Sequence, residues 1–240
     1  MIELQEPEWW RQVPTLSGPT LKVREVEHCD LDTLFGLLTD PRVTEFIASP
    51  PPSAAAFQGF IEWAHHQREA GKCVCFAVVP NGLKKAVGLF QLRALEPTFR
   101  TAEWGFAIGA SFWSTGVFEE AAVLVAQFAF TTIGVHRLEA RSVVDNTRGN
   151  RALEKIGAQG EAVLRKAFKR SATQFLWSII SDDWTPPQRV VRSPFDAAKL
   201  KMEIGRVVEK HSAVAAERAS DARPFPFFLT DSSGKPDDTL

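Results

Sequence analysis

The order of element types between residues 101 and 158 constrains this chain more than any other feature. The stretch TAEWGFAI (101–108) alternates large apolar residues with small or polar ones, which predicts a strand with two different faces. A loop of small residues follows. Apolar residues then recur at helical spacing from Val117, with Gly134 as the expected end of that helix. A second strand (HRLEARSVV), a polar loop and a short helix complete a predicted mixed α/β unit.

The loop between the first strand and the first helix has the chemistry of a phosphate site. A helix start leaves backbone N–H groups unpaired and carries a partial positive charge, so phosphate oxygens are suitable partners there. Gly116 allows the backbone to approach closely, and Ser114 and Thr115 add hydroxyl donors. Glu119 and Glu120, in the first helical turn, are expected to point away from such an anion. An ordinary strand-to-helix turn is the alternative interpretation.

With these residue types at these spacings, the segment resembles the acetyl-CoA-binding core of the GNAT superfamily of N-acetyltransferases. Within it, the segment is similar to the branch of ribosomal-protein alanine acetyltransferases. The family places an Arg/Gln-x-x-Gly-x-Gly/Ala loop here, often with an aromatic first residue in that branch. Phe118 departs from the usual small residue. The resemblance implies that one run of loop residues binds the diphosphate: Trp113, Ser114, Thr115, Gly116, Val117 and Phe118.

The second half of the segment carries a further signature. The pattern Asn-x-x-x-Asn-x-Ala-Leu-x-Lys-x-Gly-Ala begins at Asn146 and resembles a GNAT motif, with Gly149 where serine is common. In GNAT folds the two strands splay apart, and their backbone groups pair with the pantetheine arm. Asn146 can also cap a helix, and both roles can hold together. The resemblance implies further cofactor contacts from both sides of the gap: Phe106, Ala107, Ile108, Asn146 and Asn150.

The resemblance covers residues 10–184 and is closest to a group of bacterial GNAT proteins. It implies the GNAT acyl-CoA N-acyltransferase fold, an α/β (α+β) fold whose central mixed, mostly antiparallel sheet has helices on both faces. We therefore expect a GNAT domain over residues 1–184. A linker and an amphipathic helix are expected over 185–219, and a disordered tail over 220–240.

The flanking sequence predicts the rest of that order. Elements are expected on both sides of the core: a strand from Leu21, a helix capped by Asp30, a longer helix capped by Ser53, a hairpin of 73–79 and 87–95, and final strands over 161–169 and 174–181.

Composition excludes several classes of protein. The net charge of −1 gives no electrostatic case for binding nucleic acid or an anionic membrane. The acidic N-terminal residues lack an apolar segment, so no signal peptide is expected, and no run approaches the ~18 apolar residues of a membrane span. Three cysteines argue against a disulfide framework and for a reducing compartment, so we expect a cytoplasmic protein. Cys73 and Cys75 are expected to be buried thiols, and no metal site is predicted.

The chemistry implied by the resemblance needs a base for the acceptor amine. The leaving thiol has an ordinary pKa of ~8.5 and departs tolerably without help. GNAT enzymes often use a tyrosine as general acid, but this chain contains no tyrosine. That role is vacant or falls to water, Ser142 or Asn146. Glu103 and Glu45 are the candidate catalytic bases, and a solvated or ion-paired carboxylate is the alternative for each.

The sequence thus predicts an N-acetyltransferase that moves an acetyl group from acetyl-CoA to a primary amine by direct attack in a ternary complex. The acceptor is expected to be a protein N-terminus or a small amine, because the fold alone does not fix it. A non-catalytic relative that binds a CoA ester as a sensor or interaction module is the alternative. The sequence is compatible with both a monomer and a homodimer.

Overall fold

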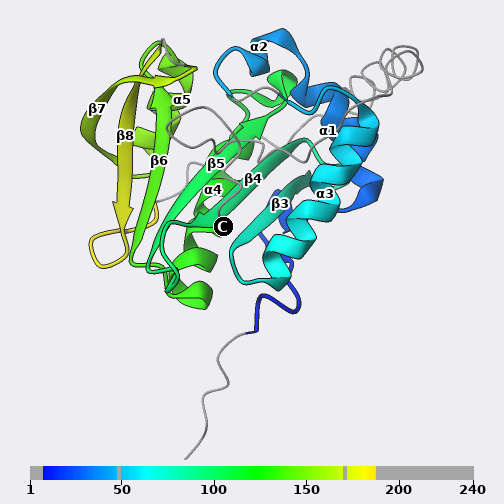
Figure 1. Ribbon diagram of the computed structural model, residues 1–240, viewed down its shortest axis with the longest axis horizontal. Coiled ribbons are helices and arrows are strands. Elements are labelled where there is room, and N and C mark those ends of the chain that lie inside the picture. The colour runs from blue at the N-terminus through cyan, green and yellow to red at the C-terminus, as the bar shows by residue number, and fades with distance from the viewer. Residues whose placement is uncertain (1–7, 48–49, 170–171, 188–240) are drawn as a thin grey trace, which may run out of the picture.

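A single eight-stranded sheet forms the centre of the computed structural model, which describes residues 8–47, 50–169 and 172–187 (Figure 1). Its strand order is β1-β2-β3-β4-β5-β6-β8-β7. Only β5 and β6 pair in parallel, so the expected mixed, mostly antiparallel sheet is confirmed. The strands are β1 (Leu16–Ser17), β2 (Leu21–Glu25), β3 (Cys73–Pro80), β4 (Gly88–Ala94), β5 (Thr101–Ile108), β6 (Arg137–Val143), β7 (Gln159–Phe168) and β8 (Ala172–Ile180).

Helices cover both faces of this sheet, as the GNAT resemblance implied. One face carries α1 and α3, and the other carries α4 and α5 (Figure 1). The helices are α1 (Leu31–Leu38), α2 (Pro41–Thr44), α3 (Ala54–Glu69), α4 (Val117–Phe128) and α5 (Thr147–Lys155), with 3-10 turns at His28–Asp30 and Ala110–Phe112 and a π-helical turn at Ala129–Ile133.

Local capping chemistry sets the ends of several helices, as predicted. The Ser53 side chain accepts a hydrogen bond from the Ala56 N–H (3.1 Å) and begins α3. Asn146 begins α5 by accepting from the Gly149 N–H (3.0 Å). Gly134 adopts φ 86° after the π-helical turn that extends α4, a left-handed conformation that glycine reaches without a steric penalty.

Three local features differ from the sequence-based expectation. Asp30 does not cap α1 with its side chain; its buried carboxylate accepts from the Arg24 guanidinium (2.7 and 2.8 Å) and the Glu27 N–H. The sequence analysis also missed the two-residue strand β1 and the single turn α2. Both are too short to show a hydrophobic period, because such a pattern needs several turns or alternations.

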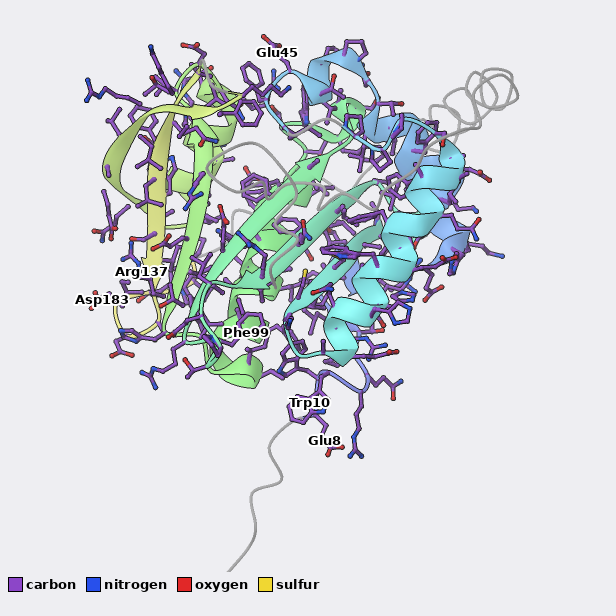
Figure 2. All side chains as sticks on the ribbon, in the orientation of Figure 1. Glu8, Trp10, Glu45, Phe99, Arg137 and Asp183 are labelled. Atoms are coloured by element: carbon purple, nitrogen blue, oxygen red, sulfur yellow. The ribbon has the colours of Figure 1, made fainter. Side chains whose placement is uncertain are left out.

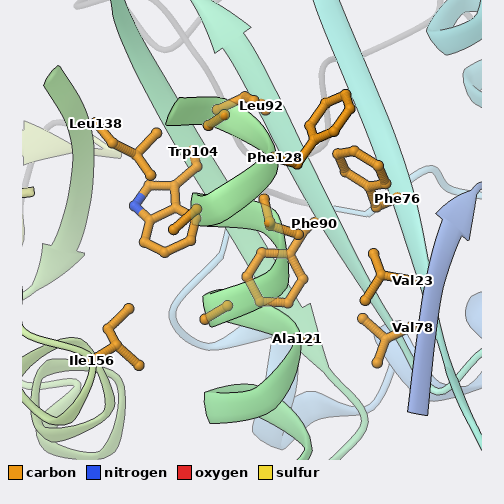
Figure 3. Packing of buried hydrophobic residues seen from close by; sticks show 14 of the residues in the cluster. Val23, Phe76, Val78, Phe90, Leu92, Trp104, Ala121, Phe128, Leu138 and Ile156 are labelled. Carbon is orange, nitrogen blue, oxygen red and sulfur yellow. The ribbon is translucent and has the colours of Figure 1, made fainter. Parts of the chain in front are cut away.

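The two faces of the sheet enclose separate apolar clusters. On the α4 face, Phe76, Phe90 and Trp104 are fully buried against α4 residues such as Phe128 (Figure 3). On the other face, the buried aromatic residues of α3 contact Cys73, Cys75, Ala77 and Leu89 of β3 and β4, among others. Both of these cysteines are buried free thiols, as predicted. Each large side chain that is fully buried in these clusters stabilises the fold by ~1.5–3 kcal/mol.

Trp184 anchors the last described segment to the domain. Its indole Nε1–H donates to the Ile156 carbonyl (2.8 Å), and its ring packs edge-on against Phe130 with centroids 5.4 Å apart. The chain therefore remains attached to the fold as far as Trp184. The helix and tail expected over 185–219 and 220–240 lie outside the described residues, apart from 185–187.

Candidate active site

The strands β5 and β6 pair at one end only. Their register runs through three rungs and ends at Glu103↔Glu139, although β5 continues to Ile108 and β6 to Val143. Figure 1 shows the two strands side by side at one end and apart at the end near α2 and α5. Beyond the last rung, the backbone N–H and C=O groups that face the gap have no partner on the opposite strand, so they are available to a ligand. We call this gap the split.

The loop before α4 turns through two residues with left-handed backbone. Gly116 is the residue before the helix, with φ 89°, and Ser114 has φ 61°. Left-handed conformation is rare for a serine, so the surrounding contacts must hold it. Two such contacts exist: the Thr115 hydroxyl donates to the Phe112 carbonyl (2.6 Å), and the Trp113 Nε1–H donates to the Ile108 carbonyl (2.9 Å). The loop is therefore preorganised with its amides at the start of α4.

A cavity of about 170 Å³ joins this loop to the split. Its wall has four parts: the end of β5 (Phe106, Ala107, Ile108), the loop and first turn of α4 (Phe112, Trp113, Ser114, Phe118, Glu119), α5 with its cap (Asn146, Arg148, Gly149, Arg151, Ala152, Lys155) and α2 with the following turn (Arg42, Val43, Phe46, Ile47). The cavity therefore has an apolar floor and a basic rim along α5.

The structure brings most of the predicted cofactor residues to this cavity. Phe106, Ala107, Ile108, Trp113, Ser114, Phe118 and Asn146 all line it. Thr115 and Gly116 belong to the loop but do not line it, and Val117 is fully buried in the core. Space for an approaching group remains at Gly116, because apart from its chain neighbours no atom of the described residues lies within 4 Å of where its Cβ would be. Contact of these residues with CoA remains a prediction.

Asn150 has a position different from that of Asn146. It is buried, and it does not line the cavity. Its Nδ2 donates to the Val143 and Val144 carbonyls (both 3.1 Å), and its Oδ1 accepts from the Trp177 indole (3.1 Å). Both ends of the amide are thus used inside the protein. These bonds connect α5 to the end of β6 and to β8.

Phe118 extends an aromatic cluster at the cavity floor. Its ring lies 4.7 Å from that of Phe106 and stacks on Phe90 at 5.8 Å between centroids. The residue that departs from the small side chain usual in GNAT loops is therefore accommodated by large partners on β4 and β5. The deviation is a packing feature of this chain, and it leaves α4 starting at Val117 as expected.

The two glutamates at the start of α4 have different surroundings. Glu120 is buried and bonded to Thr20, away from the cavity, in agreement with the sequence analysis. Glu119 lines the cavity, which is contrary to the expectation, and it pairs with Lys155 of α5 (3.4 Å). Since Arg148 and Arg151 lie on the same face of α5, positive charge still predominates along that rim. Such a rim suits an anionic ligand.

Glu103 lies at the closed end of the split. It stands on the last paired rung, its side chain is 6% exposed, and it projects on the face of α1 and α3. Arg93 Nη2 bonds one carboxylate oxygen at 3.1 Å, and Arg141 Nε lies 3.6 Å from the other. The geometry thus provides a buried, ion-paired carboxylate beside the gap. A role as catalytic base remains a prediction.

Glu45, like Glu103, lies outside the cavity wall. It is exposed on the outer turn after α2 and does not line the cavity (Figure 2). Ser142, one candidate acid, is buried on β6, where its hydroxyl makes no hydrogen bond with the described residues. The structure does not bring either side chain into the cavity wall.

Sequence reasoning missed two parts of the wall. The first is α2 with Phe46 and Ile47; an Asp-Pro pair at residues 40 and 41 is a signal for its start, since Asp40 accepts from the Arg42 N–H and Pro41 takes the first helical position. The second is the basic stripe of α5, visible as cations three and four residues apart.

Comparison with known proteins places this arrangement in a family. Residues 20–159 match the acetyltransferase (GNAT) domain family, so the protein belongs to the GNAT acetyltransferases and is an acyltransferase. Two curated relatives are the uncharacterized N-acetyltransferases p20 of Bacillus licheniformis and YoaA of Bacillus subtilis. Their identities are 24% and 26%, over 71% and 70% of this chain and 98% and 96% of theirs.

Solved structures show the same fold. Mycobacterium smegmatis RimJ, solved in complex with CoA-disulfide, superposes with a TM-score of 0.64 at 19% identity, covering 84% of this chain and 98% of that one. The ribosomal-protein-S5-alanine acetyltransferase of Vibrio fischeri has a TM-score of 0.62 at 18% identity, covering 72% and 100%. The structural neighbours thus include members of the branch that the sequence resembles.

The described residues carry neither a membrane-crossing helix nor a metal-binding cluster. No helix among them is long and apolar enough to cross a membrane. In the same ranges, no group of three or more His, Cys, Asp or Glu side chains is arranged to hold a metal ion.

Proposed function

We propose that this protein transfers the acetyl group of acetyl-CoA to a primary amine by direct attack in a ternary complex. The observation that carries the proposal is the opening of the split beside the left-handed turn at Gly116. Backbone groups of β5 and β6 are suited to the amides of the pantetheine arm, and the amides at the start of α4 are suited to its diphosphate. The basic rim of α5 favours the same anionic molecule.

In this reaction the amine nitrogen forms a bond to the thioester carbonyl carbon, and the carbon–sulfur bond breaks. The amine loses a proton to a base, and the sulfur leaves as a thiolate that solvent can protonate. A thiol has a pKa of ~8.5, so departure needs no side-chain acid, which suits a chain without tyrosine. Glu103 is the proposed base, because it is the buried carboxylate at the closed end of the split.

The proposed acceptor is the α-amino group of a protein or peptide, with a small amine as the second option. Support comes from structural neighbours that are named as ribosomal-protein serine and alanine acetyltransferases. The apolar side chains of Phe46 and Ile47 border the cavity and could contact the first side chains of a peptide. At 18% identity these neighbours share the fold, so the acceptor needs direct measurement.

The test is thiol release from acetyl-CoA with a panel of amines. We expect turnover with peptides that begin with alanine or serine and little with a polyamine or an aminoglycoside. Product mass distinguishes acetylation of the α-amino group from acetylation of lysine. CoA binding is measured in parallel by thermal shift. Binding without turnover on any amine would contradict the proposal and support the sensor alternative.

A further inference from the structure

Arg148 and Trp113 make contact across the mouth of the split. Arg148 lies in the first turn of α5, after β6, and Trp113 lies in the loop after β5. The guanidinium carbon of Arg148 is 3.6 Å from the centroid of the Trp113 ring. Because β5 and β6 do not pair here, the contact joins two walls of the cavity that the sheet leaves apart.

The indole in this pair has a fixed position. Its Nε1–H donates to the carbonyl of Ile108, the last residue of β5, at 2.9 Å. Trp113 also comes directly before Ser114, the first left-handed residue of the loop. An arginine that stacks on a fixed ring keeps its planar group in one orientation, with its N–H edges still free to donate.

Two other cations of the cavity wall are paired with carboxylates, and Arg151 lacks, within the described residues, the aromatic contact that Arg148 makes. Lys155 pairs with Glu119 at 3.4 Å, and Arg42 pairs with Asp40 at 2.6 Å. Arg148, by contrast, forms no ion pair or hydrogen bond within residues 8–47, 50–169 and 172–187; its contact is the indole face. Its donors therefore lie at the cavity wall and are not occupied by a carboxylate of the described residues.

We infer that Arg148 is a binding residue for the diphosphate of CoA, held ready by Trp113. The guanidinium donates from its edge to a phosphate oxygen on the α5 side, while the loop amides at the start of α4 donate from the other side. Charge-assisted bonds from arginine to phosphate are strong, and a donor that is already oriented loses little freedom on binding. This inference rests on the proposed use of CoA as the acyl donor.

The experiment is calorimetric titration with CoA and with dephospho-CoA, which lacks the 3′-phosphate but keeps the diphosphate. We expect Arg148→Gln to lower the affinity for both ligands about tenfold, because a charge-assisted bond to the diphosphate is lost in each case. Arg165→Gln is the matched control: it removes an exposed arginine of β7 that does not line the cavity, and it should leave both affinities unchanged.

Two further variants test the stacking itself. Arg148→Lys keeps the charge without the planar group, and we expect it to recover only part of the lost affinity. A double-mutant cycle combines Arg148→Gln with Trp113→Leu. The fold-loss of CoA affinity in the double variant should be smaller than the product of the two single fold-losses, because each single change already disrupts the pair. Strictly multiplicative losses would show that the indole does not prepare the arginine.

The outcomes separate this inference from the proposed function. If the wild-type protein fails to bind CoA, the proposed function is wrong. If it binds CoA and Arg148→Gln binds equally well, the inference alone is overturned. A loss confined to CoA, with dephospho-CoA unaffected, would assign Arg148 to the 3′-phosphate and overturn the assignment to the diphosphate. If Arg148→Lys binds CoA as tightly as the wild type does, the positive charge alone explains the affinity, and the role of stacking on Trp113 is overturned.

Discussion

Glu120, in the first turn of α4, accepts hydrogen bonds from both the backbone N–H and the hydroxyl of Thr20, one hundred residues earlier in the chain. The Thr20 backbone nitrogen lies 3.0 Å from Glu120 Oε1, and Glu120 is 8% exposed. Gly18 makes room for it, since a Cβ there would lie 2.2 Å from the carboxylate. The pair fixes the start of α4 to the β1–β2 turn and turns the negative charge away from the cavity.

We therefore predict that Glu120→Ala lowers the free energy of unfolding by about 2 kcal/mol, because it leaves the partly buried Thr20 donors without their acceptor. Urea denaturation without ligand measures this change. The matched control is Glu119→Ala, which removes a neighbouring, partly exposed ion pair and should cost at most about 0.5 kcal/mol. Equal losses in the two variants would contradict the anchoring role.

The turn at Gly116 supplies a test of CoA binding. Gly116→Val should remove the rise in melting temperature that saturating CoA gives, because a branched residue distorts the left-handed backbone and fills the open approach. Gly134→Val is a matched control, since Gly134 also has positive φ (86°) and open space at its Cβ. Both variants should be destabilised alike, but only Gly134→Val should keep the CoA shift. If CoA raises the melting temperature of Gly116→Val as much as that of the wild type, the assignment of CoA binding to this loop is wrong.

The proposed base is tested by isosteric substitution. Glu103→Gln keeps size and hydrogen bonding but removes the charge, and we expect turnover to fall by about two to four orders of magnitude. Glu45→Gln should stay near wild-type activity, because the Glu45 side chain is exposed on the turn after α2.

A structural role for Glu103 predicts a different result. Loss of the Arg93 and Arg141 ion pairs alone would lower stability and CoA affinity with turnover at saturation little changed. The readouts are therefore turnover, CoA affinity and melting temperature together. If both Gln variants retain nearly full activity, neither carboxylate is the base, and water acting against backbone carbonyls becomes the better account.

Truncation tests the domain boundary at Trp184. A chain that ends after residue 187 should keep its melting temperature and its CoA binding, because the described contacts of the domain remain complete. A chain that ends after residue 183 loses the indole bond to Ile156 and the packing on Phe130. Losing about 2 kcal/mol should lower its melting temperature by roughly 5 °C. Loss of soluble protein in the longer of these chains would show that later residues complete the core.

The stability of the fold at acidic pH should depend on the ion pair between Glu161 and Arg137. Hydrogen bonds from Arg137 first, and from Ser178 second, lower the pKa of Glu161 from its ordinary 4.5 to about 2. A depressed carboxyl pKa stabilises the fold above the unfolded value and loses that contribution as pH falls from about 4.5 towards 2.

The melting temperature of Glu161→Gln should therefore lie below that of the wild type at pH 7, by an amount that narrows as pH falls below about 5. The pair is partly exposed, so we expect no more than about 1 kcal/mol at neutral pH. Glu154→Gln, an exposed glutamate of α5, is the comparison. A difference that does not depend on pH would contradict the electrostatic origin.

The sequence by itself determined the order of the longer elements, several helix ends and the position of the glycine-containing loop before α4. These features depend on signals a few residues apart: alternation in β5, the caps Ser53 and Asn146, and glycines at Gly116 and Gly134. Such signals act within one or two turns of chain, so they can be read without knowing which strands are neighbours.

Only the tertiary structure decided which side chains contact one another at the site. It placed Arg148 on Trp113, enclosed Asn150 in bonds to β6 and β8, set Glu103 between two arginines, and turned Glu119 towards the cavity. Each of these contacts involves a residue outside the element that carries its partner. The spacing of residue types constrains faces and ends of single elements, whereas the partner of a side chain follows from the strand order and the distance at which β5 and β6 part.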